Sequence, residues 1–153
     1  MTTIAVTRSQ IAADGLVLCD GFRVRTNERK IIVRDNVIYA HAGTTALFPF
    51  VLHWIRNGAD PDKAPKPDED WCMIVIDAED GPRIYQKCLP YPEAQDYPFA
   101  IGSGRDIART AMRLGRSAHE AIEIACQEDS RSGGEIYAVD IASALGLVAA
   151  KAA

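Results

Sequence analysis

The chemistry suggested by this sequence begins at its second residue. Thr2 follows Met1, and a small residue at this position favours removal of the methionine by an aminopeptidase. A threonine left at the N-terminus carries a nucleophilic Oγ and a free α-amine. The amine has an ordinary pKa of about 7.7–8.0, so it can act as the base for its own hydroxyl. Residues 3–6 have the composition of a strand, which would hold this candidate nucleophile on a rigid element.

Two charged residues could support such a nucleophile. Short strands at 3–7 and 10–13 are joined by a tight turn, and this hairpin should return Asp14 to the neighbourhood of Thr2. Lys30 begins a strand at 30–34 and could face inwards to a carboxylate. A partly buried lysine would favour the neutral form of a nearby amine, while Asp14 would keep that lysine charged and oriented. Asp20, which follows the strand-like run 16–19, is the alternative partner for Lys30.

Two further stretches and one cysteine carry polar groups of interest. The first is Gly102-Ser103-Gly104 ahead of a helix, which is usually a flexible cap region but can also cradle an anion. The second is 129–134, Asp-Ser-Arg-Ser-Gly-Gly, ordinarily a polar loop. Cys19 is an alternative nucleophile, but no histidine lies near it in sequence. Singly, none of these stretches indicates an enzyme.

The composition limits the class of protein. The net charge of -4 and the pI near 5.3 argue against nucleic acid or an anionic membrane surface as a partner. No stretch approaches the roughly 20 apolar residues of a membrane span, and the start lacks the pattern of a signal peptide, so we expect a cytoplasmic protein. The four cysteines are scattered without a C-x-x-C pair, which indicates neither a metal site nor a disulfide framework, and we expect no cofactor.

The order of predicted elements indicates one domain over 1–153. Strands at 22–25, 30–34 and 37–40 precede a helix at 45–57 and a charged, proline-rich loop at 58–70. A hairpin follows at 71–77 and 83–89, then a proline-rich connection at 90–98 and a strand at 99–101. Helices at 106–114 and 118–128, the second opened by the capping box Ser117-x-x-Glu120, precede strands at 135–139 and 145–148. This order fits helices packed on a pair of mostly antiparallel sheets.

Together, these stretches resemble the proteasome β-subunit and HslV peptidase family, and the compact phage-type members most closely. The motifs that carry the resemblance are T-T-I at the start, A-A-D-G, R-K-I, Y-A-H-A-G, A-I-G-S-G and D-x-x-S-G-G, in this order. The resemblance implies an α+β fold of the N-terminal nucleophile (Ntn) hydrolases, a four-layer αββα sandwich of two mostly antiparallel sheets. Larger members carry two long helices after the Gly43 region, whereas this chain has room for one, so we expect a shortened helical layer.

The resemblance also implies a role for each matching residue. Thr2 would attack the carbonyl, Lys30 would tune it, and Asp14 would orient the lysine; the A-A-D-G wording favours Asp14 over Asp20. Ser103, Asp129 and Ser132 match the residues that hold the α-amine and a water.

Two further positions match the side of the site that receives substrate. The backbone N–H of Gly43 matches the oxyanion donor, the type of contact that stabilises a tetrahedral intermediate. His41 matches the residue that lines the pocket for the side chain before the scissile bond, which would suggest a polar or acidic preference.

The expected activity is therefore that of a threonine-type endopeptidase, contingent on removal of Met1. The expected partners are a peptide or unfolded protein as substrate, further copies of the chain in a homo-oligomeric ring, and an ATP-dependent unfoldase. Two other functions remain open: a non-catalytic structural subunit of a proteasome-like oligomer, and an amidohydrolase that acts on a small amide.

Overall fold

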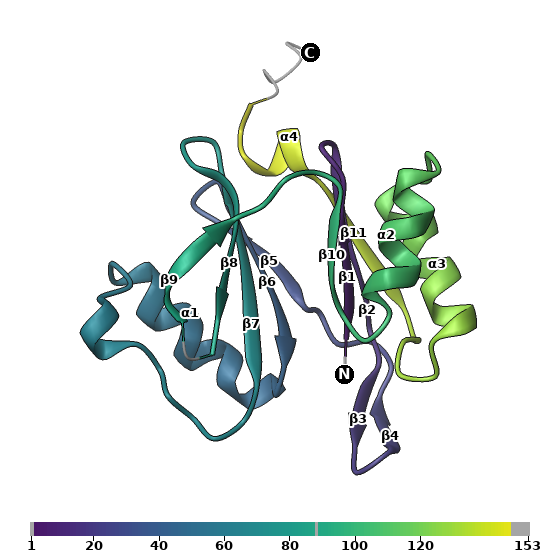
Figure 1. Cartoon of the computed structure of the whole chain (residues 1–153), viewed down its shortest axis with the longest axis horizontal. Coiled ribbons are helices and arrows are strands. Elements are labelled where there is room, and N and C mark those ends of the chain that lie inside the picture. The colour runs from purple at the N-terminus through teal and green to yellow at the C-terminus, as the bar shows by residue number, and fades with distance from the viewer. Residues whose placement is uncertain (1, 88, 148–153) are drawn as a thin grey trace, which may run out of the picture.

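Two antiparallel sheets stacked face to face form the centre of the molecule (Figure 1). The computed structural model describes residues 2–87 and 89–147. One sheet has four strands in the order β10-β1-β2-β11, and the other has five in the order β5-β6-β7-β8-β9. The four-stranded sheet contains β1 (Thr3–Val6), β2 (Gln10–Asp14), β10 (Phe99–Gly102) and β11 (Ile136–Asp140). The five-stranded sheet contains β5 (Ile31–Arg34), β6 (Val37–Gly43), β7 (Trp71–Asp77), β8 (Gly81–Gln86) and β9 (Leu89–Ala94).

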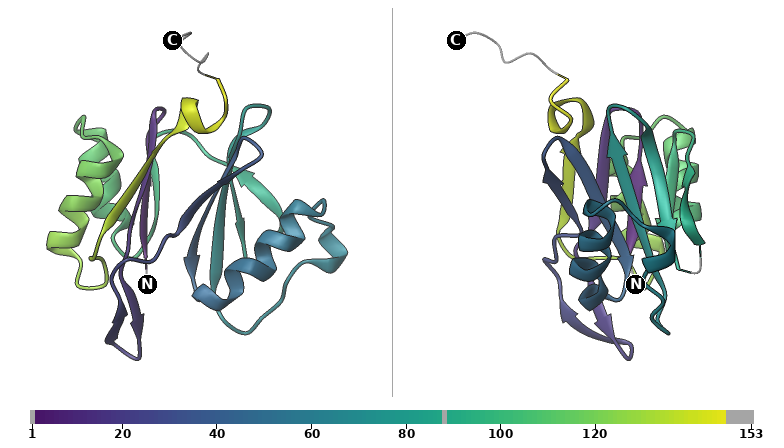
Figure 2. Two further views of the ribbon diagram at one scale, coloured as in Figure 1. Left: turned by 180° about the vertical axis from the view of Figure 1, so that it is seen from behind. Right: turned by 90° about the vertical axis from the view of Figure 1, so that its left-hand side faces the viewer.

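Helices cover the two outer faces, so the molecule has four layers (Figure 2). The four-stranded sheet carries α2 (Arg105–Arg113) and α3 (Ala118–Glu128). The five-stranded sheet carries α1 (Phe48–Arg56), which is preceded by the short 3₁₀ helix η1 (Thr45–Leu47). A second 3₁₀ turn, η2 (Pro61–Lys63), follows α1. The predicted αββα sandwich with a shortened helical layer is thus confirmed.

Alternation along the strands explains why both faces of each sheet are buried. On β1, Ile4 and Val6 point into the core between the sheets, whereas Ala5 points to α2 and α3. On β7, Ile74 and Ile76 enter the same inter-sheet core, and the alternate residues pack against α1. The residues that face α2 and α3 are mostly alanines, which lets these helices approach the sheet closely.

Several predicted elements end where sequence signals place them. Ser117 accepts a hydrogen bond from the backbone N–H of Glu120, whose side chain accepts from the Ser117 N–H, so the predicted capping box is formed. Such caps stabilise a helix by about 1 kcal/mol. Pro49 lies within the first turn of α1, where its missing N–H costs nothing.

Two predictions of local structure are wrong. The stretch 90–98, expected as a connection, contributes most of β9, and β8 ends at Gln86 rather than continuing to 89. The strand expected at 145–148 is absent from the described residues 145–147, and Val148 lies outside the described residues. Instead the short helix α4 (Ile141–Ala144) begins after Asp140, whose side chain accepts from the Ser143 N–H at 2.8 Å.

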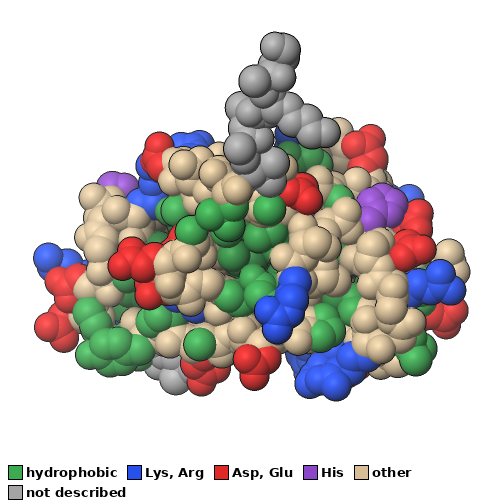
Figure 3. Space-filling view, turned by 90° about the horizontal axis from the view of Figure 1, so that it is seen from above, with side chains coloured by type: hydrophobic (Ala, Val, Ile, Leu, Met, Phe, Trp, Pro, Cys, Tyr) green, Lys and Arg blue, Asp and Glu red, His purple; other side chains and the backbone are tan. Residues whose placement is uncertain are grey.

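The end of the sandwich that carries α4 is closed by apolar side chains. In the view onto this end, hydrophobic side chains gather near the centre and most of the charged ones lie around the outside (Figure 3). Ile141 and Leu145 belong to the inter-sheet core and are 4 % and 8 % exposed. The opposite end carries the projecting hairpin of β3 (Val17–Cys19) and β4 (Phe22–Arg25), and the start of β1 lies at this end too (Figure 1). None of the described helices is long and apolar enough to cross a membrane.

Candidate active site

The N-terminal segment lies at the end of the molecule that carries the β3–β4 hairpin, where β1 begins (Figure 1). Thr2 directly precedes β1 and is only 4 % exposed. Its carbonyl oxygen accepts a hydrogen bond from the Ser103 N–H at 3.0 Å, which ties it to the end of β10. Thr3 pairs with Gly102 in the β1–β10 ladder, so the position of Thr2 is fixed by backbone pairing on this side.

Asp14 and Lys30 form a buried ion pair close to this segment. Lys30 Nζ lies 3.0 Å from Asp14 Oδ1, and the two side chains are 2 % and 0 % exposed. Asp14 also accepts backbone N–H groups from Thr3 at 2.8 Å and from Gly133 at 3.1 Å. Lys30 Nζ donates a second bond to the Leu16 carbonyl at 2.7 Å. The lysine and the acid are therefore both held in one orientation.

This contact distinguishes the two acids that the sequence offered as partners for Lys30. Asp14 is the last residue of β2, and pairing of β2 with β1 brings it beside Thr3. Asp20 lies in the turn between β3 and β4, exposed and in the left-handed region at φ 50°. Asp14 thus contacts Lys30 because the first hairpin is short.

Burial has an electrical consequence for Lys30. Loss of solvation lowers the pKa of its ammonium below the ordinary value, and the charge of Asp14 opposes this effect without cancelling it. A cation fixed here disfavours a second positive charge nearby. An amine close to Lys30 would therefore have a lowered pKa and would be neutral more of the time at neutral pH.

Ser103, Asp129 and Ser132 form a second polar cluster. Both serine hydroxyls donate to Asp129 Oδ2, each at 2.6 Å. Partial burial of Asp129 opposes its ionisation, but the hydrogen bonds from the two serines and from the Arg131 N–H prevail and lower its pKa. Asp129 is therefore a carboxylate at neutral pH, able only to accept hydrogen bonds.

The glycines around Ser103 allow the backbone to approach the N-terminal segment. Gly102 has φ +96°, and a Cβ there would lie 1.6 Å from the Thr2 carbonyl oxygen. Gly104 has a similar restriction, since its Cβ would lie 2.7 Å from Thr3 Oγ1. Both glycines of Gly102-Ser103-Gly104 are thus needed for close packing against the N-terminal segment, and the stretch is not a flexible cap.

A cleft of about 1160 Å³ opens beside these groups. Thr2, Lys30, Gly43 and Ser103 line it together, at the ends of β1, β5, β6 and β10. Three further residues do not line the cleft: Asp14 bonds to Lys30, Asp129 bonds to Ser103, and Ser132 joins the group through Asp129. Cys19, the alternative nucleophile, is exposed at the end of β3 and also lines the cleft.

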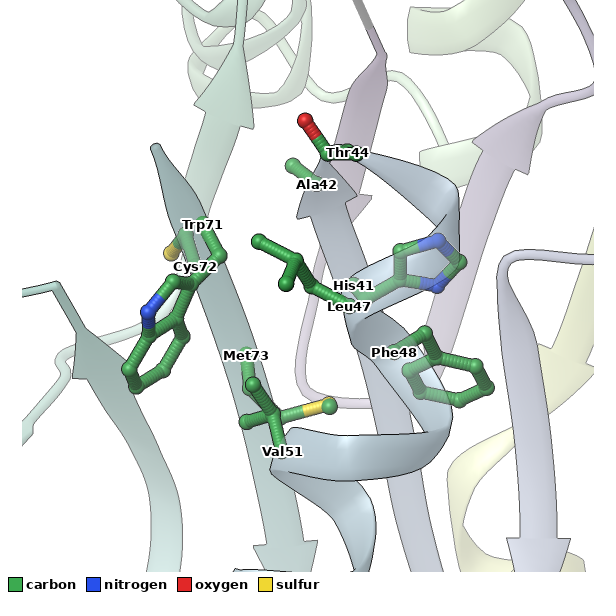
Figure 4. A pocket seen from close by; sticks show the side chains of 9 residues that line it. All are labelled: His41, Ala42, Thr44, Leu47, Phe48, Val51, Trp71, Cys72 and Met73. Carbon is green, nitrogen blue, oxygen red and sulfur yellow. The ribbon is translucent and has the colours of Figure 1, made fainter. Parts of the chain in front are cut away.

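His41 lies in a separate, smaller cavity next to the cleft (Figure 4). The cavity has a volume of about 10 Å³ and shares Ala42, Thr44, Trp71 and Cys72 with the cleft. His41 is 4 % exposed and stacks on Phe48 with ring centroids 4.1 Å apart. Its Nδ1 has no hydrogen-bond partner among the described residues. Burial, together with the charge of Lys30, lowers its pKa to about 4, so the imidazole is neutral at pH 7.

Thr3 also belongs to the site, although the sequence analysis did not include it among the polar residues there. It is 0 % exposed, its Oγ1 lies 2.6 Å from Ser132 Oγ, and it accepts from the Gly104 N–H at 2.8 Å. The signal for it was available: Thr3 shares a strand face with Ala5, which packs against helices, and a buried hydroxyl needs partners.

Comparisons with solved structures agree with this architecture. HslV from Trypanosoma brucei matches with a TM-score of 0.71 and 19% sequence identity, covering 90% of this chain and 98% of its own. The Thiobacillus denitrificans protein BPH, solved in complex with epoxomicin, matches with a TM-score of 0.65 and 17% identity, covering 91% and 96%. No protein-family model and no curated protein matches the sequence. The chain therefore shares the fold of HslV and of BPH.

Proposed function

We propose that this chain is a threonine-type endopeptidase whose nucleophile is Thr2, exposed by removal of Met1. The observation that carries the proposal is the buried pair of Lys30 with Asp14, because Lys30 lines the same cleft as Thr2. The positive charge of a lysine held in this place disfavours a second positive charge nearby, so it is suited to keeping a neighbouring amine neutral. The fold supports the proposal, since BPH, a protein of similar fold, was solved in complex with epoxomicin.

The reaction would proceed by acyl transfer. The α-amine of Thr2, kept neutral by the positive charge of Lys30, takes the proton from Thr2 Oγ as the oxygen attacks the substrate carbonyl. The Gly43 N–H, at the cleft end of β6, stabilises the oxyanion of the tetrahedral intermediate. The α-ammonium then gives its proton to the leaving amine, which leaves an ester between Thr2 Oγ and the acyl group. A water, deprotonated by the same amine, hydrolyses the ester.

The remaining residues would position these groups. Asp14 orients Lys30, and the Ser103–Asp129–Ser132 cluster holds the α-amine and the hydrolytic water. His41 lines the pocket for the side chain that precedes the scissile bond. Because its imidazole is neutral at pH 7, it would recognise a polar side chain by hydrogen bonding and offer an acidic one no charge attraction.

The proposal extends to substrate and assembly. An unfolded protein or peptide in the cleft is the substrate, the chain works in the cytoplasm as a homo-oligomeric ring, and an ATP-dependent unfoldase supplies the unfolded chain. The likeness to HslV supports this assembly. Sedimentation velocity tests it, because a ring would sediment several times faster than a monomer of 16.7 kDa.

The decisive experiment is the intact mass of the purified chain before and after treatment with a peptide epoxyketone. This inhibitor needs both the hydroxyl and the free amine of an N-terminal threonine. We expect a chain without Met1 that gains one inhibitor mass, and a Thr2→Ala control that gains none. A second preparation, released from a ubiquitin fusion so that it starts at Thr2, removes dependence on the aminopeptidase.

The outcomes separate the rival functions. A folded chain that starts at Thr2 and takes no inhibitor contradicts the proposal and favours a structural subunit. A chain that takes the inhibitor and hydrolyses small amides, but not casein or peptides, favours an amidohydrolase.

A further inference from the structure

Thr3 links the backbone of β10 to the serine–aspartate cluster. It lies on β1 directly after Thr2 and has no exposed surface. Its Oγ1 accepts a hydrogen bond from the Gly104 N–H at 2.8 Å and lies 2.6 Å from Ser132 Oγ. Ser132, itself 6 % exposed, is 2.6 Å from Asp129 Oδ2. Four groups thus form one continuous chain from Gly104 to Asp129.

The direction of the hydrogen bonds along this chain follows from counting protons. Asp129 is a carboxylate and only accepts, so Ser132 uses its single hydroxyl proton to donate to it. In the contact between Thr3 and Ser132 the donor must then be Thr3. The Gly104 N–H can only donate, so Thr3 Oγ1 accepts from it while its own proton goes to Ser132. All the protons of the chain therefore point towards Asp129.

The direction of these hydrogen bonds determines whether Ser103 and Ser132 can donate to, or accept from, a neighbouring group. Ser103 also donates to Asp129, so neither serine has a hydroxyl proton left to give. Ser132 has one lone pair occupied by Thr3 and one free, and both serine oxygens can only accept from a third group. An amine or ammonium, which brings N–H donors, is the group that such a cluster suits.

We propose that Thr3 is a positioning residue that acts through Ser132. By fixing the Ser132 hydroxyl towards Asp129, it turns the free lone pair of Ser132 Oγ to the α-amine of Thr2 and so aims the amine at its own Oγ. This role rests on the proposed function of Thr2 as nucleophile and base. It assigns to the second threonine of the T-T-I start a hydrogen-bonding task that is distinct from the chemistry of the first.

The packing around Thr3 leaves little freedom for another arrangement. A Cβ on Gly104 would lie 2.7 Å from Thr3 Oγ1, 3.1 Å from Ala125 Cβ and 3.2 Å from Ser132 Oγ. The Gly104 backbone, Ala125 of α3 and Ser132 thus crowd the same small space beside the hydroxyl. Valine carries a methyl group in place of the threonine hydroxyl, so Thr3→Val removes the hydrogen bonds of Thr3 while keeping the branched shape of the side chain.

The test compares Thr3→Val with Thr3→Ser in peptide hydrolysis and in the rate of epoxyketone labelling. We expect Thr3→Val to lower kcat at least about tenfold and to slow labelling similarly, with KM within about twofold of wild type, because the amine is misaligned while the cleft is unchanged. Thr3→Ser, which keeps the hydroxyl and loses the methyl, should recover most of the rate. Urea unfolding of each variant establishes that the folded protein is being assayed.

Each other result overturns the role. Thr3→Val with wild-type kcat shows that the hydroxyl is not needed, and Thr3→Ser as slow as Thr3→Val shows that shape matters and hydrogen bonding does not. If Thr3→Val does not fold, Thr3→Ala takes its place, and the same comparison with Thr3→Ser applies. A wild-type chain that starts at Thr2 and takes no label refutes the proposed function and this role with it. A labelled wild type with an equally fast Thr3→Val refutes this role alone.

Discussion

Protonation of His41 should limit the stability of the protein in acid. The side chain is buried, its Nδ1 has no partner among the described residues, and its pKa is lowered to about 4 from the ordinary value of 6.5. In the unfolded chain the imidazole is solvated and titrates near 6.5. Between pH 6.5 and pH 4 the unfolded state therefore binds more protons than the folded state, and the free energy of unfolding falls as the pH falls.

The size of this effect follows from the two pKa values. The linkage relation gives a loss of about 2 kcal/mol between pH 7 and pH 5, and about 3 kcal/mol by pH 4. A domain of this size has a free energy of unfolding of roughly 5–15 kcal/mol, so the loss is a measurable fraction of it. The assay is urea unfolding at pH 7, 6, 5 and 4, followed by tryptophan fluorescence, since Trp54 and Trp71 are each 7 % exposed.

Two matched variants isolate the contribution of His41. His41→Leu removes the imidazole from the buried site, and His53→Leu replaces a histidine on the exposed face of α1. We expect His41→Leu to lose about 2 kcal/mol less than wild type between pH 7 and pH 5, and His53→Leu to follow wild type. If wild type and His41→Leu lose stability in parallel over this range, the burial of a neutral imidazole is not what the pH acts on.

Two further predictions concern the charged and polar groups of the site. Lys30→Met leaves the Asp14 carboxylate buried without its cation and should lower the free energy of unfolding by about 3–5 kcal/mol. Lys63→Met breaks an exposed pair with Asp60 and should lower it by less than about 1 kcal/mol. Both values are measured by urea unfolding, and equal losses would show that Lys30 and Asp14 are not a desolvated pair. In the active chain, His41→Ala should change the relative cleavage of peptides with polar and apolar residues before the scissile bond, and an unchanged preference in a peptide-library digest would remove His41 from the pocket.

The strand pattern of the sequence was enough to predict most of the layers. The tight turn after β1 predicted that β2 would return Asp14 to the N-terminal segment, and it does so by direct pairing of the two strands. The capping box at Ser117 likewise located the start of α3. Both signals are local, because a turn and a cap are decided by residues only a few positions apart.

The errors arose where a distant partner decides the structure. Pro90 and Pro92 argued against a strand, but β9 is the edge strand of its sheet and pairs irregularly with β8, so missing N–H groups are tolerated there. A strand was predicted at 145–148, and the described part of this run, 145–147, does not form one. The Asp140 cap starts a helix instead, and Leu145 reaches the inter-sheet core from the end of that helix.

The site itself could be predicted only in part, because three of its hydrogen bonds join residues over one hundred positions apart. Gly133 and Ser132 reach Asp14 and Thr3 from the loop after α3, and no local pattern in that loop specifies such contacts. The hydrogen bond from the Gly104 N–H to Thr3 Oγ1 forms because the backbone at Gly104 packs closely against β1, which the sequence does not show.

The energetics of Asp14 and Lys30 argue that this end of the fold is kept for function. A buried ion pair is often no more stable than a well-packed apolar pair of similar volume, since the solvation lost by both charges offsets their attraction. The rest of the space between the sheets is filled by residues such as Ile4, Ile38 and Ile74, so apolar side chains could also have filled the positions of Asp14 and Lys30. The pair instead lies where the core meets the cleft, with its lysine on the cleft wall beside Thr2. Asp14 and Lys30 thus lower the stability of the fold at one end of an otherwise apolar core. Such a pair is expected where the two side chains are kept for function.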